Sequence, residues 1–518
     1  MYWTERASTW HERITDIYII TIFFVYLLFP GFSGYRDITK AKFLFLMAAT
    51  GLWLLLLTAA LLWERPRFPR PGPAFWAMAG FMAVCLLSWA LSPWRAESLL
   101  GAGRYDGLLS ELCYALGFLG VALFTRPRRV HAVALAAGTA LCCLVAALQL
   151  FGLDPLRLFP VYSGGRYLNY YDAGLLYSGA YLGTVGNTNI LDAVLCCALP
   201  LSAALYIRGE GPLFLAPLVP GVFVLAAAGG AGAALAAACV LLILPPLTVT
   251  DRPRLRRALF LASAILAASA LAKLWQPLYA AGTLLPRFDF SPFALCLLAG
   301  SAAALGLGLA LPERYAPPAR MLRRCFLLMD GAAALGGAAL LWFWPGDSGT
   351  MYELHSALHG QLDDSFGSSR IMIWRACLGL VPERPLLGGG PGTLALRLEL
   401  RFSRYVAQSG VTLSSYVDNA HNVWLARLVN CGALGLAALA AALGFALADA
   451  SRRMAAPMTA GLCAAVAGGA VHGCFGLGLC LSEPFFWIPL ALLCSAKEVL
   501  PCSTTDTPPP EPGSSSRP

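Results

Sequence analysis

Long apolar runs recur along nearly the whole sequence, and no other feature constrains the fold as strongly. Many of these runs reach about 17 residues or more, and a helix of about 20 apolar residues crosses the hydrocarbon core of a bilayer. Hydrophobic residues make up 58% of the 518 residues and charged residues only 13%, whereas an ordinary soluble domain has about 25% charged residues. The runs do not alternate with polar residues as membrane β-strands do. The sequence therefore predicts an all-α, polytopic integral membrane protein.

The apolar runs predict about 14 transmembrane helices. They cover residues 15–33, 43–63, 74–92, 108–125, 131–152, 188–206, 212–228, 231–247, 258–275, 292–311, 325–344, 420–448, 455–480 and 483–496. Two connections, residues 153–187 and 345–419, are much longer than the others. Long loops on a rigid scaffold usually carry function. We therefore expect a functional extracytoplasmic loop before the twelfth helix.

The basic residues predict how the helices are oriented. Clusters of arginine fall in alternate connections, and cytoplasmic connections are the ones enriched in Arg and Lys. This pattern places both termini in the cytoplasm and the two long loops on the opposite face of an inner or plasma membrane. Arg36, Lys40 and Lys42 fall in a connection assigned to the outside and go against the rule.

The spans and loops predict a division of the chain into successive regions. Residues 1–152 form a five-helix membrane region and residues 153–344 a central membrane region. Residues 345–448 combine the long outer loop with the twelfth helix, and residues 449–502 hold the last helices. Residues 503–518 are rich in Pro and Ser and lack apolar residues, which predicts a disordered tail.

Several functions are disfavoured by what the sequence lacks. It contains no Walker-type phosphate loop, no GxGxxG after a strand and no HExxH. The net charge of +9 is not gathered in a basic arm or a recognisable binding module, so we expect no nucleic-acid partner. His355 and His359 lie one turn apart before Asp363 and Asp364, a conceivable metal site, but no further ligand is evident. We expect neither a metal nor a cofactor.

Residues 418–425, D-N-A-H-N-V-W-L, introduce the twelfth predicted span. Asp418 or Asn419 is expected to cap the helix. His421 would then lie in the first turn, where the positive end of the helix dipole favours a neutral imidazole. A neutral imidazole accepts a proton, which makes His421 a candidate general base. The alternative is an interfacial histidine bonded to a loop carbonyl.

Arginines in the long loop before that span are candidates for phosphate binding. Arg370 offers a planar fork of donors that suits phosphate oxygens, and the glycines of residues 385–392, P-L-L-G-G-G-P-G, permit close backbone approach. A surface arginine bound to lipid headgroups is the alternative. Arg397, Arg401 and Arg404 are spaced for one face of an amphipathic helix at the membrane surface, where they would contact headgroups or substrate.

Taken in order, these motifs make the chain resemble the O-antigen ligase and polymerase superfamily. Its signature region has an arginine-bearing segment, a P-L-L-G-x-G turn and a His-Asn-x9-Gly-x-x-Gly pattern. His421, Asn422, Gly432 and Gly435 fill the last pattern. Residues 103–109, G-R-Y-D-G-L-L, and 183–189, G-T-V-G-N-T-N, are also similar to earlier segments of the superfamily. The resemblance implies that Asn422 lies in the substrate-binding site.

The resemblance implies metal-independent glycosyl transfer at the outer face. A glycan would move from a polyprenyl-diphosphate carrier to a hydroxyl of a glycan, lipid or protein acceptor, with His421 as the base and Arg370 as the diphosphate ligand. Many members carry Ser-Arg-Gly at the outer end of the eighth span. Residues 229–233 read G-G-A-G-A here. Either another arginine, such as Arg104 or Arg166, replaces the missing one, or this protein has a different substrate or reduced activity.

Two other functions remain open from the sequence. A transporter or flippase of lipid-linked or amphipathic solutes is compatible with about 14 helices and with Asp192 and Asp330 inside predicted spans. Transporters usually show paired repeats with broken helices, and the absence of a convincing repeat favours the transferase. A catalytically silent relative that acts as an assembly partner is the third hypothesis, since one arginine is missing.

Overall fold

The computed structural model describes most of the chain. The described residues are 8–66, 68, 70–151, 153–159, 161–162, 166–167, 182–228, 230–275, 278–280, 283–285, 288–406 and 411–495. The predicted disordered tail, residues 503–518, lies outside the described residues.

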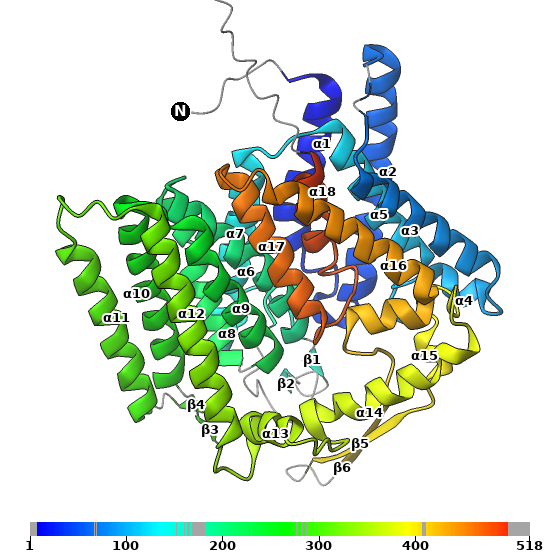
Figure 1. Ribbon diagram of the computed structural model, residues 1–518. Helices are drawn as coiled ribbons and strands as arrows, with labels where there is room; N and C mark the ends of the chain where they lie inside the picture. Colours follow the sequence, from blue (N-terminus) through cyan, green and yellow to red (C-terminus); the bar gives the residue numbers. More distant parts are fainter. Residues whose placement is uncertain are drawn as a thin grey trace, which may run out of the picture.

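Helices dominate the described residues (Figure 1). They are α1 (Trp10–Ile20), α2 (Ile38–Glu64), α3 (Pro73–Ala90), α4 (Arg95–Leu100), α5 (Leu108–Phe124), α6 (Arg129–Leu150), α7 (Thr188–Arg208), α8 (Leu218–Ala228), α9 (Ala231–Thr248), α10 (Arg252–Leu274), α11 (Pro292–Ala310), α12 (Ala319–Trp342), α13 (Gly349–Leu358), α14 (Phe366–Gly379), α15 (Leu394–Arg397), α16 (Val423–Ser451), α17 (Pro457–Gly473) and α18 (Pro484–Ser495). A π-helical turn, η1 (Thr21–Tyr26), continues α1, and the short helices η2 (Gly34–Arg36), η3 (Pro212–Leu215) and η4 (Val381–Glu383) lie in connections.

Three short antiparallel hairpins complete the described structure. They pair β1 (Val161–Tyr162) with β2 (Arg166–Tyr167), β3 (Leu278–Ala280) with β4 (Thr283–Leu285), and β5 (Arg401–Val406) with β6 (Val411–Tyr416). All three lie in connections between helices. The predicted helical class is thus confirmed, with small hairpins that the sequence did not indicate.

Each of the 14 predicted spans overlaps a helical segment in the structure. Among the described residues, 8 helices are long and apolar enough to cross a membrane, namely α2, α3, α6, α7, α10, α11, α12 and α16. Shorter apolar segments cover residues 108–124, 212–228, 232–248 and 484–495. The apolar helices confirm a protein embedded in a membrane.

Helices from the two ends of the chain pack together. The long α16 packs along α3, α18 packs against α5, and α17 packs against α7. Figure 1 shows α13, α14 and the β5–β6 hairpin along one end of the molecule and α1 at the opposite end. The segment that leads into α16 therefore meets the α3–α5 region at the end that carries the hairpin.

Lys40 and Lys42 lie in α2 and not in a loop, which corrects two of the three exceptions to the charge rule. Lys42 is fully buried there, and its Nζ donates to the carbonyl oxygens of Tyr26 and Leu27 at 2.7 and 3.0 Å. The Leu27 carbonyl also accepts from the Thr184 hydroxyl at 2.7 Å. Both carbonyls lie where the π-helical turn ends, and such turns leave carbonyls without a regular helical partner. Lys42 therefore satisfies the backbone of the first span.

Helix α16 is interrupted at Gly432, where φ is +70°. The Ala433 N–H donates to the Pro385 carbonyl at 2.8 Å, so the Gly-rich turn satisfies the backbone at this kink. A Cβ atom at position 432 would lie 2.2 Å from the Leu386 oxygen, and one at Gly388 would lie 2.4 Å from the Asn430 oxygen. The prediction that these glycines allow close backbone approach is confirmed, and the approaching backbone belongs to α16.

Replacing Gly432 with Ala tests this contact. We expect a loss of about 2 kcal/mol or more, because a side chain is disfavoured at positive φ and would overlap the Leu386 carbonyl. Gly444→Ala is the matched control in the same helix, since a Cβ there meets nothing within 4 Å. That control should be neutral or stabilising by about 0.5–1 kcal/mol. Thermal unfolding in detergent measures both, and equal midpoints for the two variants would contradict the packing described.

Candidate functional site

The loop before α16 places His421 just outside the helix. Asn422 is the N-cap residue, with its Oδ1 accepting the Leu425 N–H at 3.0 Å. The Oδ1 of buried Asn419 accepts the His421 N–H at 2.9 Å and holds His421 at a φ of +48°. The prediction that Asp418 or Asn419 caps the helix, with His421 in the first turn, was wrong by one turn. Asn422, predicted to bind substrate, caps α16.

Helix α14 brings Arg370 toward this loop. Trp374, one turn after Arg370, donates from Nε1 to the Ala420 carbonyl at 3.0 Å. Residues four apart lie on the same helix face, so Arg370 and Trp374 both face the segment that ends at His421. The Nη1 of Arg370 donates to the Gly367 carbonyl at 2.7 Å, while its Nε is buried and has no hydrogen-bond partner among the described residues.

Arg104 reaches the same loop from the connection between α4 and α5. Its Nε lies 2.5 Å from Oδ2 of Asp418, and both side chains are about one third exposed. Asp418 therefore binds an arginine that belongs to the second predicted motif, residues 103–109. Both residues lie in motifs identified from the sequence, but nothing in the sequence indicates that they form an ion pair.

The Gly-rich turn holds these distant segments together. The Ala102 N–H donates to the Gly392 carbonyl at 3.0 Å. The Ser98 hydroxyl donates to the Pro391 carbonyl at 2.7 Å, and the Ser92 hydroxyl donates to the Gly389 carbonyl at 2.5 Å. The turn that supports the kink of α16 thus also fixes the backbone that leads to Arg104.

His421 is a neutral imidazole next to two positive charges. Its pKa is lowered to about 4, chiefly by burial and further by the charges of Arg370 and Arg104. The carboxylate of Asp418 opposes this shift. The Nδ1 atom is buried without a hydrogen-bond partner among the described residues. The neutral form of His421 is the one expected from the sequence. From the sequence, the helix dipole is the expected cause, whereas burial and the charges of two arginines cause it in the structure.

Asp106 is a second titratable group at this place, and sequence reasoning did not single it out. Burial raises its pKa to about 6, against the lowering effect of Arg104. Cβ atoms at Gly101 and Gly392 would lie 2.4 and 3.0 Å from its Oδ1, so two glycines make room for this carboxyl group. The only signal in the sequence was its position inside the G-R-Y-D-G motif.

Buried ion pairs fix the helices beneath the site. Arg427, just over one turn into α16, lies 2.8 Å from Glu483 and 3.3 Å from Glu111. The Trp487 Nε1 donates to Glu483 at 2.7 Å. These contacts join α16 to α5 and α18. The sequence could have indicated these ion pairs, because an arginine and two glutamates lie within or beside apolar runs and charges inside a membrane are paired.

The other predicted arginines do not form an amphipathic helix. Arg397 ends the short α15 and is buried, with an ion pair to Glu383 at 2.9 Å. Arg401 lies in β5, where its guanidinium stacks 4.4 Å from the ring centroid of Tyr416 and donates to the Tyr416 hydroxyl. The backbone of Arg404 pairs with Leu413 in the same hairpin. The predicted helix through these positions was wrong.

Arg166 lies in β2, paired with Tyr162, and its side chain is outside the described part of the structure. The candidate metal site also does not assemble. His355 pairs through Nδ1 with the Leu341 carbonyl, and Asp364 binds Arg375. In the described ranges no three His, Cys, Asp or Glu residues gather in a way that could hold a metal ion.

Comparison with known proteins adds no assignment. No protein-family model matches the chain, and no curated protein matches it. The function must therefore be argued from the residues around His421.

The ionisation of His421 can be measured directly. The chain has 6 histidines, so ¹³C-histidine labelling gives few NMR signals, and His421→Gln assigns one of them. We expect this signal to titrate at about pH 4. Arg370→Gln should raise the midpoint, because a positive charge that disfavours the imidazolium is removed.

The same shift affects stability. An unfolded histidine has a pKa of about 6.5, so between about pH 6.5 and 4 the unfolded chain binds the proton more readily than the folded protein. The contribution of His421 to stability is therefore present above this window and falls as the pH drops through it. In the NMR titration, a midpoint for wild-type His421 between pH 6 and 7 would contradict the buried, positively charged environment of this side chain in the structure.

Proposed function

We propose that the protein is a membrane glycosyltransferase that moves a glycan from a polyprenyl-diphosphate carrier to an acceptor hydroxyl. The observation that carries this proposal is the meeting of His421, Arg370 and Arg104 from three separate segments. A buried neutral imidazole supplies a base, and two guanidinium groups supply charge for a diphosphate. The resemblance to the O-antigen ligase and polymerase superfamily supports the same assignment.

In the proposed reaction, the imidazole of His421 removes the proton from the acceptor hydroxyl. The resulting oxygen attacks the anomeric carbon of the donor glycan, and the bond from that carbon to the diphosphate oxygen breaks. The leaving polyprenyl diphosphate gains negative charge, which Arg370 and Arg104 stabilise. The donor already carries the required energy in the bond between its anomeric carbon and the diphosphate, so the reaction needs no nucleotide, and the two arginines supply the positive charge for the leaving group.

The same arginines explain how a histidine with a low pKa can act as a base. A base works best when its pKa lies near the operating pH, and a pKa of about 4 is too low. A bound diphosphate brings negative charge that offsets Arg370 and Arg104, and so raises the affinity of His421 for a proton. The donor would thereby activate the base that it needs.

Arg104 is the proposed replacement for the arginine missing from the eighth span. At that span, a Cβ on Gly230 would lie 2.6 Å from Oδ2 of buried Asp192. A carboxyl group offers no positive charge to a diphosphate at this place. Arg104 lies beside the His421 loop, and its position supports the proposal that it supplies the second positive charge.

We further propose a multi-pass protein of an inner or plasma membrane, with 14 spans and both termini in the cytoplasm. The alternation of arginine-rich connections supports this orientation. The donor and acceptor would then meet at the extracytoplasmic face, at the end of the molecule that carries α14 and the β5–β6 hairpin (Figure 1).

Glycan transfer by the purified protein tests the proposal. A labelled polyprenyl-diphosphate glycan is supplied in liposomes without metal or nucleotide, and transfer to candidate acceptors is measured. His421→Ala and Arg370→Ala should each lower the rate at least about 100-fold, because the base or the charge on the leaving group is lost.

Arg375→Ala is the matched control, since Arg375 lies on α14 as well but is exposed and paired with Asp364. It should retain wild-type transfer. Transfer that survives His421→Ala would remove the proposed mechanism. Movement of the intact donor across the bilayer, without transfer to any acceptor, would instead favour a flippase.

A further inference from the structure

A large cavity lies at the far end of α16 from His421. Its volume is about 680 Å³, and its walls come from the ends of helices: the starts of α1 and α3 and the ends of α5, α16 and α18. Helix α16 has 29 residues, which correspond to about 43 Å of helix. The cavity is therefore separate from the candidate glycosyl-transfer site, and its role does not depend on the proposed function.

The acidic groups on the cavity wall are paired with arginines that lie outside the cavity. Glu12 lies 3.1 Å from Arg128, and Asp449 lies 2.7 Å from Arg453. Neither Arg128 nor Arg453 lines the cavity. Arg128 also lies 3.1 Å from Asp16, so Glu12 shares its arginine, whereas Asp449 and Arg453 pair with each other.

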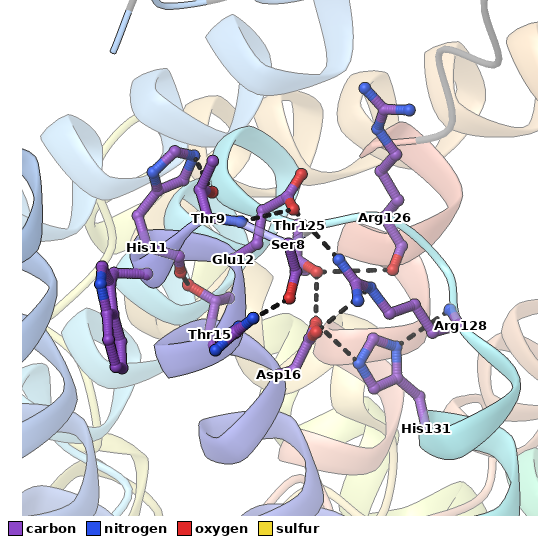
Figure 2. A network of polar contacts seen from close by, with 12 residues as sticks. Ser8, Thr9, His11, Glu12, Thr15, Asp16, Thr125, Arg126, Arg128 and His131 are labelled. Carbon is purple, nitrogen blue, oxygen red and sulfur yellow. Dashed lines mark hydrogen bonds and ion pairs between the residues drawn. The ribbon is translucent and has the colours of Figure 1, made fainter. Parts of the chain in front are cut away.

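Two arginines on the wall are not neutralised in this way. Arg126 and Arg452 line the cavity and form no ion pair among the residues described. Figure 2 shows that the Arg126 side chain extends away from the neighbouring polar network, in which Asp16 binds Arg128 and His131. The two guanidinium groups give the cavity a net positive character.

A helix N-terminus adds to this positive character. Helix α3 has 18 residues and begins at the cavity, with Gly72 as its N-cap and no side chain that caps it. The uncapped N–H groups carry partial positive charge. Among the remaining wall residues, Phe75, Leu123 and Phe445 are apolar. Arg70 also lines the cavity. The cavity thus combines two arginines without an ion pair among the described residues, a third arginine, a helix N-terminus and a hydrocarbon surface.

We propose that this cavity binds an anionic phospholipid, with the phosphate at Arg126 and Arg452 and an acyl chain against the apolar wall. Guanidinium groups match phosphate oxygens in geometry and charge. The cavity lies where several membrane helices end, which is the depth of lipid headgroups, and basic pockets between such helices bind anionic headgroups. A free phosphate ion would use the arginines but not the apolar wall.

Native mass spectrometry of protein released from detergent, after equilibration with phosphatidylglycerol, tests this site. We expect wild-type protein to retain phosphatidylglycerol in preference to phosphatidylcholine. The double variant Arg126→Gln/Arg452→Gln should retain at least about ten-fold less, and Arg126→Lys/Arg452→Lys should retain an intermediate amount because charge is kept without the planar fork.

Arg320→Gln/Arg324→Gln is the control, since both arginines are exposed at the start of α12 and lie outside the cavity. It should bind lipid as the wild type does. Unchanged thermal midpoints establish that the cavity variant is folded. Equal retention by the cavity and control variants would overturn the proposal, and so would displacement of the lipid by millimolar inorganic phosphate, which would assign the arginines to a free ion.

Discussion

The contact between the Gly-rich turn and the kink of α16 is the constraint on which the rest of the site depends. Gly388 and Gly432 let two backbones approach so closely that a Cβ on either would overlap a carbonyl. The same turn binds the backbone that leads to Arg104, through the bond from Ala102 to Gly392. One short segment therefore joins α3, α4 and α16, and Arg104, two residues beyond Ala102, binds Asp418 in the loop that carries His421.

Charge at this end of the molecule is arranged around a buried imidazole. Burial disfavours a proton on His421 most strongly, and Arg370 and Arg104 add to this effect, while Asp418 pairs with Arg104 and opposes it. Without a ligand, such a site keeps two positive charges close to a base that cannot be protonated near neutral pH. Under the proposed function, an anionic diphosphate would relieve this arrangement, since it would bind the arginines and raise the basicity of the histidine. Binding of the donor and activation of the acceptor would then be one linked event.

The sequence predicted the helical membrane fold well, because the length of an apolar run reports directly on a span. It also brought out Arg104, Arg370 and His421, since these lie in short motifs. It failed where distant partners decide the outcome. The arginines from 397 to 404 have helical spacing, yet pairing with β6 makes residues 401–406 a strand. Asn419 and Asn422 both suit an N-cap, and only the hydrogen bonds select Asn422.

The most direct test of the linked event is the pKa of His421 with and without a bound short-chain polyprenyl diphosphate. We expect saturation with the diphosphate to raise this pKa from about 4 toward neutrality, by about one unit or more, because its negative charge offsets both arginines. Arg370→Gln should reduce the shift. A diphosphate that binds at saturation but leaves the pKa near 4, or that does not bind, would contradict the proposal that the arginines place the leaving group beside the base.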